Sequence, residues 1–204
     1  MIIAKSTVKE LKKRLIKVAS LNSALSLLEW DRDVNLPKKG VLFRGEAIQE
    51  LSSIVHSSFL AINSDGLLTE LKKLYDLNKI KGNDAVVVFE VWRDYQRAKK
   101  LPDEFVREQA LILTKANSVW VKAKNENNFK LFLPYLTKIV ELKRKEAEYI
   151  GYINSPYDAL LDVYEPGMNT VEASRVLNDL RNFLIPFLKK IKQSKVKIDP
   201  NKIL

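Results

Sequence analysis

Apolar residues recur every three to four positions along most of this chain, which is the spacing of one face of an α-helix. In the first segment the recurring residues are Val8, Leu11, Leu15, Val18, Leu25 and Leu28. Thr7 followed by Glu10 has the spacing of a capping box, so this helix is expected to begin there and to run to about Trp30. Asp31–Gly40 contains Pro37 and Gly40, and is expected to be a connection.

Turn-forming residues divide the rest of the chain into further helices. These are expected at about 42–61, 67–77, 83–100, 103–124 and 129–150, then in a short helix after Ser155-Pro156 ended by Pro166-Gly167, and at 170–192. Asn83 and Thr170 are the expected caps of their helices, and Pro186 is expected to kink the last one. The run Val86–Phe89 is the only strand-like stretch, but it leads into a helical segment without a turn and is assigned to that helix.

The pattern therefore predicts an all-α protein of seven to eight helices. One helical domain is expected over residues 1–192, followed by a lysine-rich tail at 193–204, because no internal linker is long enough to separate two domains.

Composition narrows the class of protein further. The chain has no cysteine, which excludes disulfides, thiolate metal sites and cysteine nucleophiles and suits a reducing cytosol. Its first residues do not resemble a signal peptide, and no apolar run approaches the roughly 20 residues needed to span a bilayer. A cytoplasmic protein without membrane contact is expected. Abundant lysine and glutamate with few methionines are also typical of thermophilic proteins.

The net charge of +10 is confined to the two ends of the chain. Residues 5–17 carry six basic side chains and one acid, and residues 189–202 carry the same, so the central part is neutral. A nucleic-acid-binding domain more often spreads basic residues over one face among aromatic side chains, and these ends contain no aromatic residue. Solvated lysines are the favoured interpretation, and a nucleic-acid partner is not expected.

No residue pattern for catalysis or metal binding is evident in the sequence. His56 is the only histidine, so neither an H-E-x-x-H zinc motif nor the E-x-x-H pairs of a di-iron bundle can be formed. A structural role for His56 is favoured over a ligand role. No G-x-S-x-G elbow, P-loop or G-x-G-x-x-G motif occurs either. The chain is therefore expected to hold no catalytic residue, no metal and no cofactor.

Two stretches contain more unusual residues than packing alone requires. The first comprises Leu28-Glu29-Trp30-Asp31, then Leu36-Pro37, Arg44 and Gln49. The second is the fourteen-residue run Ser155–Met168, SPYDALLDVYEPGM, with two tyrosines, three acids and two prolines. Taken alone, the second stretch is interpreted as a structural connection whose tyrosine hydroxyls bond to the backbone.

Together these stretches resemble the M32, or carboxypeptidase Taq, family of metallocarboxypeptidases. Further residues follow in that family's order: Tyr95-Gln96-Arg97-Ala98, Leu101-Pro102, Ala116, Trp120 and Val140-Glu141-Leu142-Lys143-Arg144. The resemblance covers about residues 8–192. It implies an all-helical, saddle-shaped fold, usually dimeric, in an enzyme that removes single residues from peptide C-termini with zinc or cobalt.

The resemblance implies a fold for this chain, but it assigns no catalytic residue to it. In the family the metal is bound by H-E-x-x-H and a further Glu, and these motifs have no counterpart in this sequence. Trp30, Asp31, Pro37 and Arg44 match the first helical pair of the family. The segment containing Tyr157, Tyr164, Glu165, Pro166 and Gly167 is expected to border the substrate groove.

The leading hypothesis is the N-terminal helical part of an M32 metallocarboxypeptidase, inactive alone. Such a chain could be half of a split enzyme, a truncated product or fragment, or a remnant with a binding role. Apolar surface left exposed would be covered by a homo-oligomer or by a complementary catalytic half. The alternative is a stand-alone helical interaction or nucleic-acid-binding protein that uses its lysine-rich ends.

Overall fold

The structure, a computed structural model, describes residues 2–194 and confirms the all-α prediction. The α-helices are α1 (Ile2–Val34), α2 (Val41–Leu60), α3 (Leu67–Asp76), α4 (Asn83–Ala98), α5 (Asp103–Asn125), α6 (Phe129–Ile150), α7 (Pro156–Leu161) and α8 (Thr170–Gln193). Short 3-10 helices, η1 (Lys38–Gly40) and η2 (Ala61–Asn63), precede and follow α2. The described residues include no strand, and none of their helices has the length and apolarity that crossing a membrane requires.

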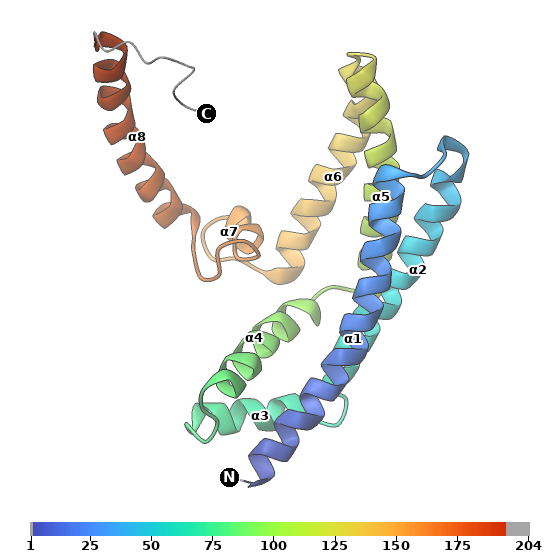
Figure 1. The fold of residues 1–204 in the computed structure, drawn as a ribbon, viewed down its shortest axis with the longest axis vertical. Helices are drawn as coiled ribbons and strands as arrows, with labels where there is room; N and C mark the ends of the chain where they lie inside the picture. Colours follow the sequence, from blue (N-terminus) through green and yellow to red (C-terminus); the bar gives the residue numbers. More distant parts are fainter. Residues whose placement is uncertain (1, 195–204) are drawn as a thin grey trace, which may run out of the picture. The chain divides into compact units, whose positions relative to one another are not determined.

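The chain divides into two compact units, residues 1–150 and residues 151–204. In the first unit, α2 packs against α1 and α5, α5 packs against α6, and α3 packs against α4 and α1 (Figure 1). In the second unit α7 contacts α8. A single helical domain over 1–192 stays a prediction, and of the predicted tail at 193–204 residues 195–204 lie outside the described residues.

The main core of the first unit lies where α1, η2, α3 and α4 meet. Its most deeply buried members are Leu11, Leu68, Leu71 and Val88, whose side chains have no exposed surface. Val88 comes from the strand-like run 86–89, which the structure places in α4. The core position explains the composition there, because β-branched residues are tolerated in a helix when tertiary packing stabilises it.

Several predicted helix ends were wrong by a few residues. α1 begins at Ile2, so Thr7 and Glu10 lie inside the helix and do not cap it. The same helix continues past Trp30 to Val34 and ends just before the Leu36-Pro37 pair. Proline disfavours helical geometry in the residue before it, which explains why the helix cannot continue through Leu36.

The predicted caps of two other helices were wrong by one residue. Gly82 precedes α4 with φ 61° and ψ −146°, a conformation that glycine adopts readily, and Asn83 is the first helical residue. Asn169 caps α8, because its side chain accepts a hydrogen bond from the backbone N–H of Glu172. Thr170 is the first residue of that helix.

The start of α7 was predicted correctly, but its end was not. The helix begins at Ser155-Pro156, as the sequence predicts. Ser155 caps α7 in a capping box with Asp158, and Pro156 occupies the first helical position. The helix ends at Leu161, however, and Pro166-Gly167 lies in the turns that follow it.

Candidate functional site

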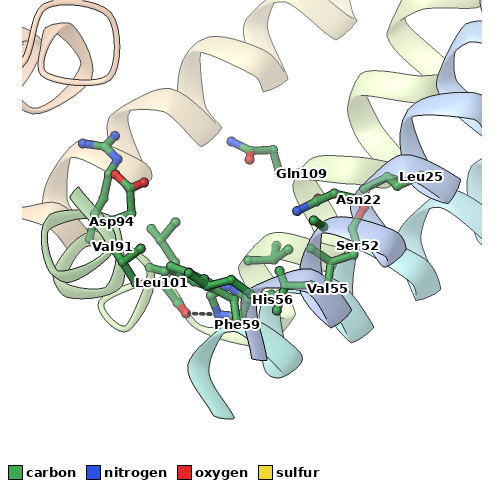
Figure 2. Close-up of a pocket in the computed structure, with 16 residues that line it drawn as sticks. Asn22, Leu25, Ser52, Val55, His56, Phe59, Val91, Asp94, Leu101 and Gln109 are labelled. Carbon is green, nitrogen blue, oxygen red and sulfur yellow. Dashed lines mark hydrogen bonds between the residues drawn. The ribbon is translucent and has the colours of Figure 1, made fainter. Parts of the chain in front are cut away.

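A cavity of about 670 Å³ lies among α1, α2, α4 and α5 of the first unit (Figure 2). Ten apolar side chains from these helices and the α4–α5 connection form most of its wall. The polar side chains that line it are Asn22, Ser52, His56, Asp94, Arg97 and Gln109. A mainly apolar cavity of this size with a few polar groups is typical of small-molecule sites.

His56 lies in the wall of this cavity, and its ring is held by the backbone. Its Nε2 lies 3.1 Å from the carbonyl oxygen of Leu101, shown as a dashed line in Figure 2. A carbonyl oxygen only accepts hydrogen bonds, so Nε2 carries a proton. The contact fixes the connection between α4 and α5 against α2, which is a structural role.

One wall of the cavity is braced by a nearly buried carboxylate. Glu146 of α6 accepts hydrogen bonds from Arg97 of α4 at 3.1 Å, Gln109 of α5 at 3.2 Å and Lys143 at 2.6 Å. Burial raises the pKa of Glu146, but the bonds from Lys143, Gln109 and Arg97 outweigh it and leave the pKa below its usual range. The ionised carboxylate therefore ties three helices together.

A second polar cluster connects α2 to the start of α5. Asp103 accepts a hydrogen bond from Ser53 at 2.6 Å and pairs with Arg107, which also pairs with Glu50. The bond from Ser53, followed by that from Arg107, lowers the pKa of Asp103. Because Asp103 also lies in the first turn of α5, its charge is stabilised by the helix dipole.

The cavity has the shape of a binding site but not the groups for hydrolysis. The hydroxyl of Ser52 donates to the carbonyl of Ile48 in its own helix, at 2.7 Å, and not to His56. A nucleophile and its base must share a hydrogen bond for acyl transfer. Among residues 2–194, no three histidine, cysteine, aspartate or glutamate side chains converge as metal ligands would.

The residues predicted to mark the first helical pair lie at the junction of α1 and α2. Arg44 of α2 pairs with Asp31 of α1 at 2.5 Å and donates to the carbonyl of Leu28 at 3.0 Å. The bond from Arg44 lowers the pKa of Asp31. Pro37 precedes η1 in an extended conformation, and Trp30 is exposed. Neither Asp31 nor Arg44 lines the 670 Å³ cavity.

The five residues predicted to border a substrate groove lie on α7 and the turns after it. Tyr157 and Tyr164 are exposed, Tyr164 to 81%. Gly167 has φ 81°, in the left-handed region, and its N–H donates to Asp162 at 2.9 Å. Glu165 and Pro166 complete the turn and are also exposed. The segment is a shaped, tyrosine-bearing surface within the second unit, and its role at a groove stays a prediction.

Asp158 holds this segment together. Its Oδ1 accepts hydrogen bonds from the backbone N–H and the hydroxyl of Thr170, both at 2.7 Å, and its Oδ2 accepts from the N–H of Ser155 at 3.3 Å. These bonds, that from the Thr170 hydroxyl first, lower the pKa of Asp158 below its ordinary 3.8. One carboxylate thus joins the start of α7 to the start of α8.

The second unit is expected to lose stability in acid. Because the pKa of Asp158 is lower in the folded unit, its contribution is present above about pH 4 and is lost as the pH falls further, when the folded carboxylate takes up a proton. Hydrogen exchange at the amides of Ser155 and Thr170 should therefore accelerate, relative to intrinsic rates, as the pH falls below about 4. Asp158→Asn should show fast exchange already at pH 6. Exchange unchanged in both conditions would contradict this role.

Sequence reasoning missed most residues of the cavity. Asp94, Arg97 and Gln109 lie on helices whose apolar periodicity predicts only packing, and Asn22 is an ordinary polar residue in α1. Residues up to 94 positions apart line the same space, so no short motif could have revealed it.

Comparison with known proteins accounts for this fold. Residues 10–204 match the family described as Carboxypeptidase Taq (M32) metallopeptidase. Thermostable carboxypeptidase 1 of Pyrococcus furiosus is 36% identical over 91% of this chain, and Carboxypeptidase 1 of Bacillus subtilis is 31% identical over 91%. The BsuCP crystal structure superposes with a TM-score of 0.82 at 28% identity, covering 98% of this chain and 39% of its own. The chain belongs to the M32 metallopeptidase family, and it spans 36% of the length of these two curated relatives.

The family implies a metal, and the residues of this chain do not fit one. The sequence has one histidine and no cysteine. His56 bonds to a backbone carbonyl, and no three potential ligands gather anywhere in the described residues. A zinc site needs three or four such ligands. No catalytic step is therefore assigned to residues of this chain.

Proposed function

We propose that this chain is the helical, non-catalytic part of an M32 metallocarboxypeptidase, and that peptide C-terminal trimming requires a metal-binding region outside this sequence. The observation that carries the proposal is the contrast between an M32 match over residues 10–204 and a donor set that cannot bind the metal. The chain supplies a helical scaffold, and the complementary region supplies the metal and the reacting groups.

The tyrosine-bearing segment is proposed as part of the groove wall. Tyr157 and Tyr164 are exposed, and tyrosine is enriched at protein interfaces because it combines an apolar ring with a polar hydroxyl. The bonds of Asp158 and Asp162 hold the segment in one shape. A surface held in this way can contact a peptide without a large ordering cost.

The complementary region is proposed to cover the apolar side of α8. No residue of that helix is buried within the described chain. Its exposed large apolar side chains are Val171, Val176, Leu177, Leu180, Phe183, Leu184, Ile185, Phe187, Leu188 and Ile191. So many exposed apolar side chains on one helix are typical of an interaction site. Association of two copies through α8 is the alternative means of covering it.

The proposal predicts that the purified chain is inactive alone. Incubated with excess zinc or cobalt and then desalted, it should retain well below one metal ion per chain by mass spectrometry. It should also release no C-terminal residue from a mixed peptide substrate. The M32 enzyme of Bacillus subtilis, treated in the same way, is the positive control. Stoichiometric metal with peptide hydrolysis by the 204-residue chain would refute the proposal.

The partner is tested by isolating the tagged chain from cells of its source organism under gentle conditions. A stoichiometric protein that carries H-E-x-x-H is the expected companion, and it should be lost from the Leu180→Glu, Leu184→Glu variant. Recovery of the chain by itself, or only with further copies of itself, would contradict a complementary catalytic region.

A further inference from the structure

A second cavity, of about 370 Å³, lies between the first turns of α1 and the connection from α3 to α4. Figure 1 shows these two segments side by side at one end of the first unit. Its lining residues are Lys5 and Val8 of α1, Asn78, Lys79, Ile80 and Lys81 of the connection, and Asp84 of α4. It shares no residue with the 670 Å³ cavity.

The floor of this cavity is fixed by the core. Val8 and Ile80 are 2% and 7% exposed and belong to the main apolar cluster. The connection is also held by its backbone, because Asn78 and Lys79 donate to the carbonyls of Tyr75 and Leu74, both at 2.9 Å. Asn78 adopts the left-handed conformation at φ 55° to make this turn. Backbone hydrogen bonds therefore hold the connection that carries Lys79 and Lys81 beside the buried Val8 and Ile80.

The charge at this cavity is not compensated. Within residues 2–194, no carboxylate lies within ion-pair distance of Lys5, Lys79 or Lys81. The single carboxylate in the lining, Asp84, is paired at 2.6 Å with Lys12, which projects from the next turns of α1. Three lysines therefore line one cavity, and none of them is in an ion pair with a carboxylate of the described residues.

These lysines lie at helix N-termini, where the helix dipole disfavours positive charge. The first turn of α1 has no acidic residue, and Lys79 and Lys81 directly precede the start of α4. Cations are unfavourable near the positive end of a helix dipole. Residues that break a local rule without a compensating contact are often found at functional sites.

We propose that this cavity binds a small phosphate-bearing molecule. Lysine ammonium groups are strong donors to phosphate oxygens, and three of them match a multiply charged group such as a diphosphate. The apolar base of Val8 and Ile80 leaves space for an organic substituent of the phosphate, in a volume within the usual range of ligand pockets. The site does not depend on the carboxypeptidase proposal, because it uses neither the metal nor the groove segment.

The test is calorimetric titration of the 204-residue chain with inorganic pyrophosphate, and separately with ADP and with adenosine, at about 150 mM salt. Saturable binding of one pyrophosphate or ADP per chain is expected, with no binding of adenosine. Lys79→Gln, Lys81→Gln should weaken this affinity by about tenfold or more, because a charge-assisted bond is lost at each position.

A matched control removes the same charge elsewhere in the first unit. Lys130 and Lys138 of α6 are exposed, and Lys130→Gln, Lys138→Gln should leave the affinity unchanged. Circular dichroism should show both double variants folded, since all four side chains are on the surface. Equal weakening in both variants would show general charge attraction and overturn the proposal.

Two further outcomes would also overturn it. The first is the absence of saturable pyrophosphate and ADP binding at this salt concentration. The second is binding of a single-stranded oligonucleotide that weakens steeply with salt while neither pyrophosphate nor ADP binds, which would assign the lysines to a nucleic acid.

Discussion

Replacing Leu71 by alanine is expected to lower the free energy of unfolding of the first unit by about 2–5 kcal/mol. Leu71 has no exposed surface and packs in the cluster where α1, η2, α3 and α4 meet, so the shortened side chain leaves a cavity lined by core residues. The effect is measured by urea unfolding followed by tryptophan fluorescence. All three tryptophans, Trp30, Trp92 and Trp120, belong to this unit, so the signal reports on it alone.

Leu77→Ala is the matched control for this experiment. Leu77 follows α3 and is 63% exposed, so its truncation should change the free energy of unfolding by less than about 0.5 kcal/mol. Similar effects for both substitutions would contradict a core at this place.

Replacing Glu146 by alanine is expected to lower the free energy of unfolding by about 3 kcal/mol, because it removes a nearly buried carboxylate that accepts hydrogen bonds from three side chains. Arg97 and Gln109 would lose their common acceptor, and only Lys143, whose side chain is 45% exposed, can turn to water easily. The measurement is the same urea unfolding. Glu141→Ala, an exposed position on the same helix, should be close to neutral.

A double substitution separates the net value of the Arg97–Glu146 pair from the cost of removing only one member of it. Arg97→Met with Glu146→Leu removes both charges and should be much less destabilising than Glu146→Ala, since an apolar pair of similar size does not separate a buried charge from its acceptor.

The pH dependence of unfolding gives a further check on the Glu146 network. The folded-state pKa of Glu146 is lowered, so its contribution is present above the unfolded pKa and is lost as the pH falls below about 4.5. Glu146→Ala should unfold with a weaker dependence on acid, and an unchanged dependence would exclude the network as its cause.

Helix content was predictable because it depends on spacing and on short-range chemistry. The apolar period and the turn-forming residues located the eight α-helices of residues 2–194, and Ser155-Pro156 was identified as the start of a short helix. The same short-range logic failed at Thr7, which lies inside α1, because a capping pattern is only a preference and the residues before it also adopt helical geometry. The prediction of Asn83 as the cap of α4 also failed. Gly82 occupies the cap position, because the backbone angles there are readily adopted by glycine and costly for a residue with a side chain.

The two cavities could not be predicted in this way. Lys5 and Lys79 are 74 positions apart, and only the packing of α1 against α3 brings them to one hollow. The sequence showed that positive charge is concentrated near its N-terminus, but not that two lysines of a later turn join it. His56 was predicted as structural, while its partner, the carbonyl of Leu101, carries no side-chain signal.

The sequence by itself determined the helical class, the resemblance to M32 enzymes and the lack of metal-ligand motifs, since each depends on residue type and local spacing. The tertiary structure alone decided which polar groups meet, as at Glu146, Asp158 and the lysine-lined cavity. The reason is physical. A helix face can be read from its period, but the contact between two faces depends on long-range packing, which brings together residues with no relation along the chain.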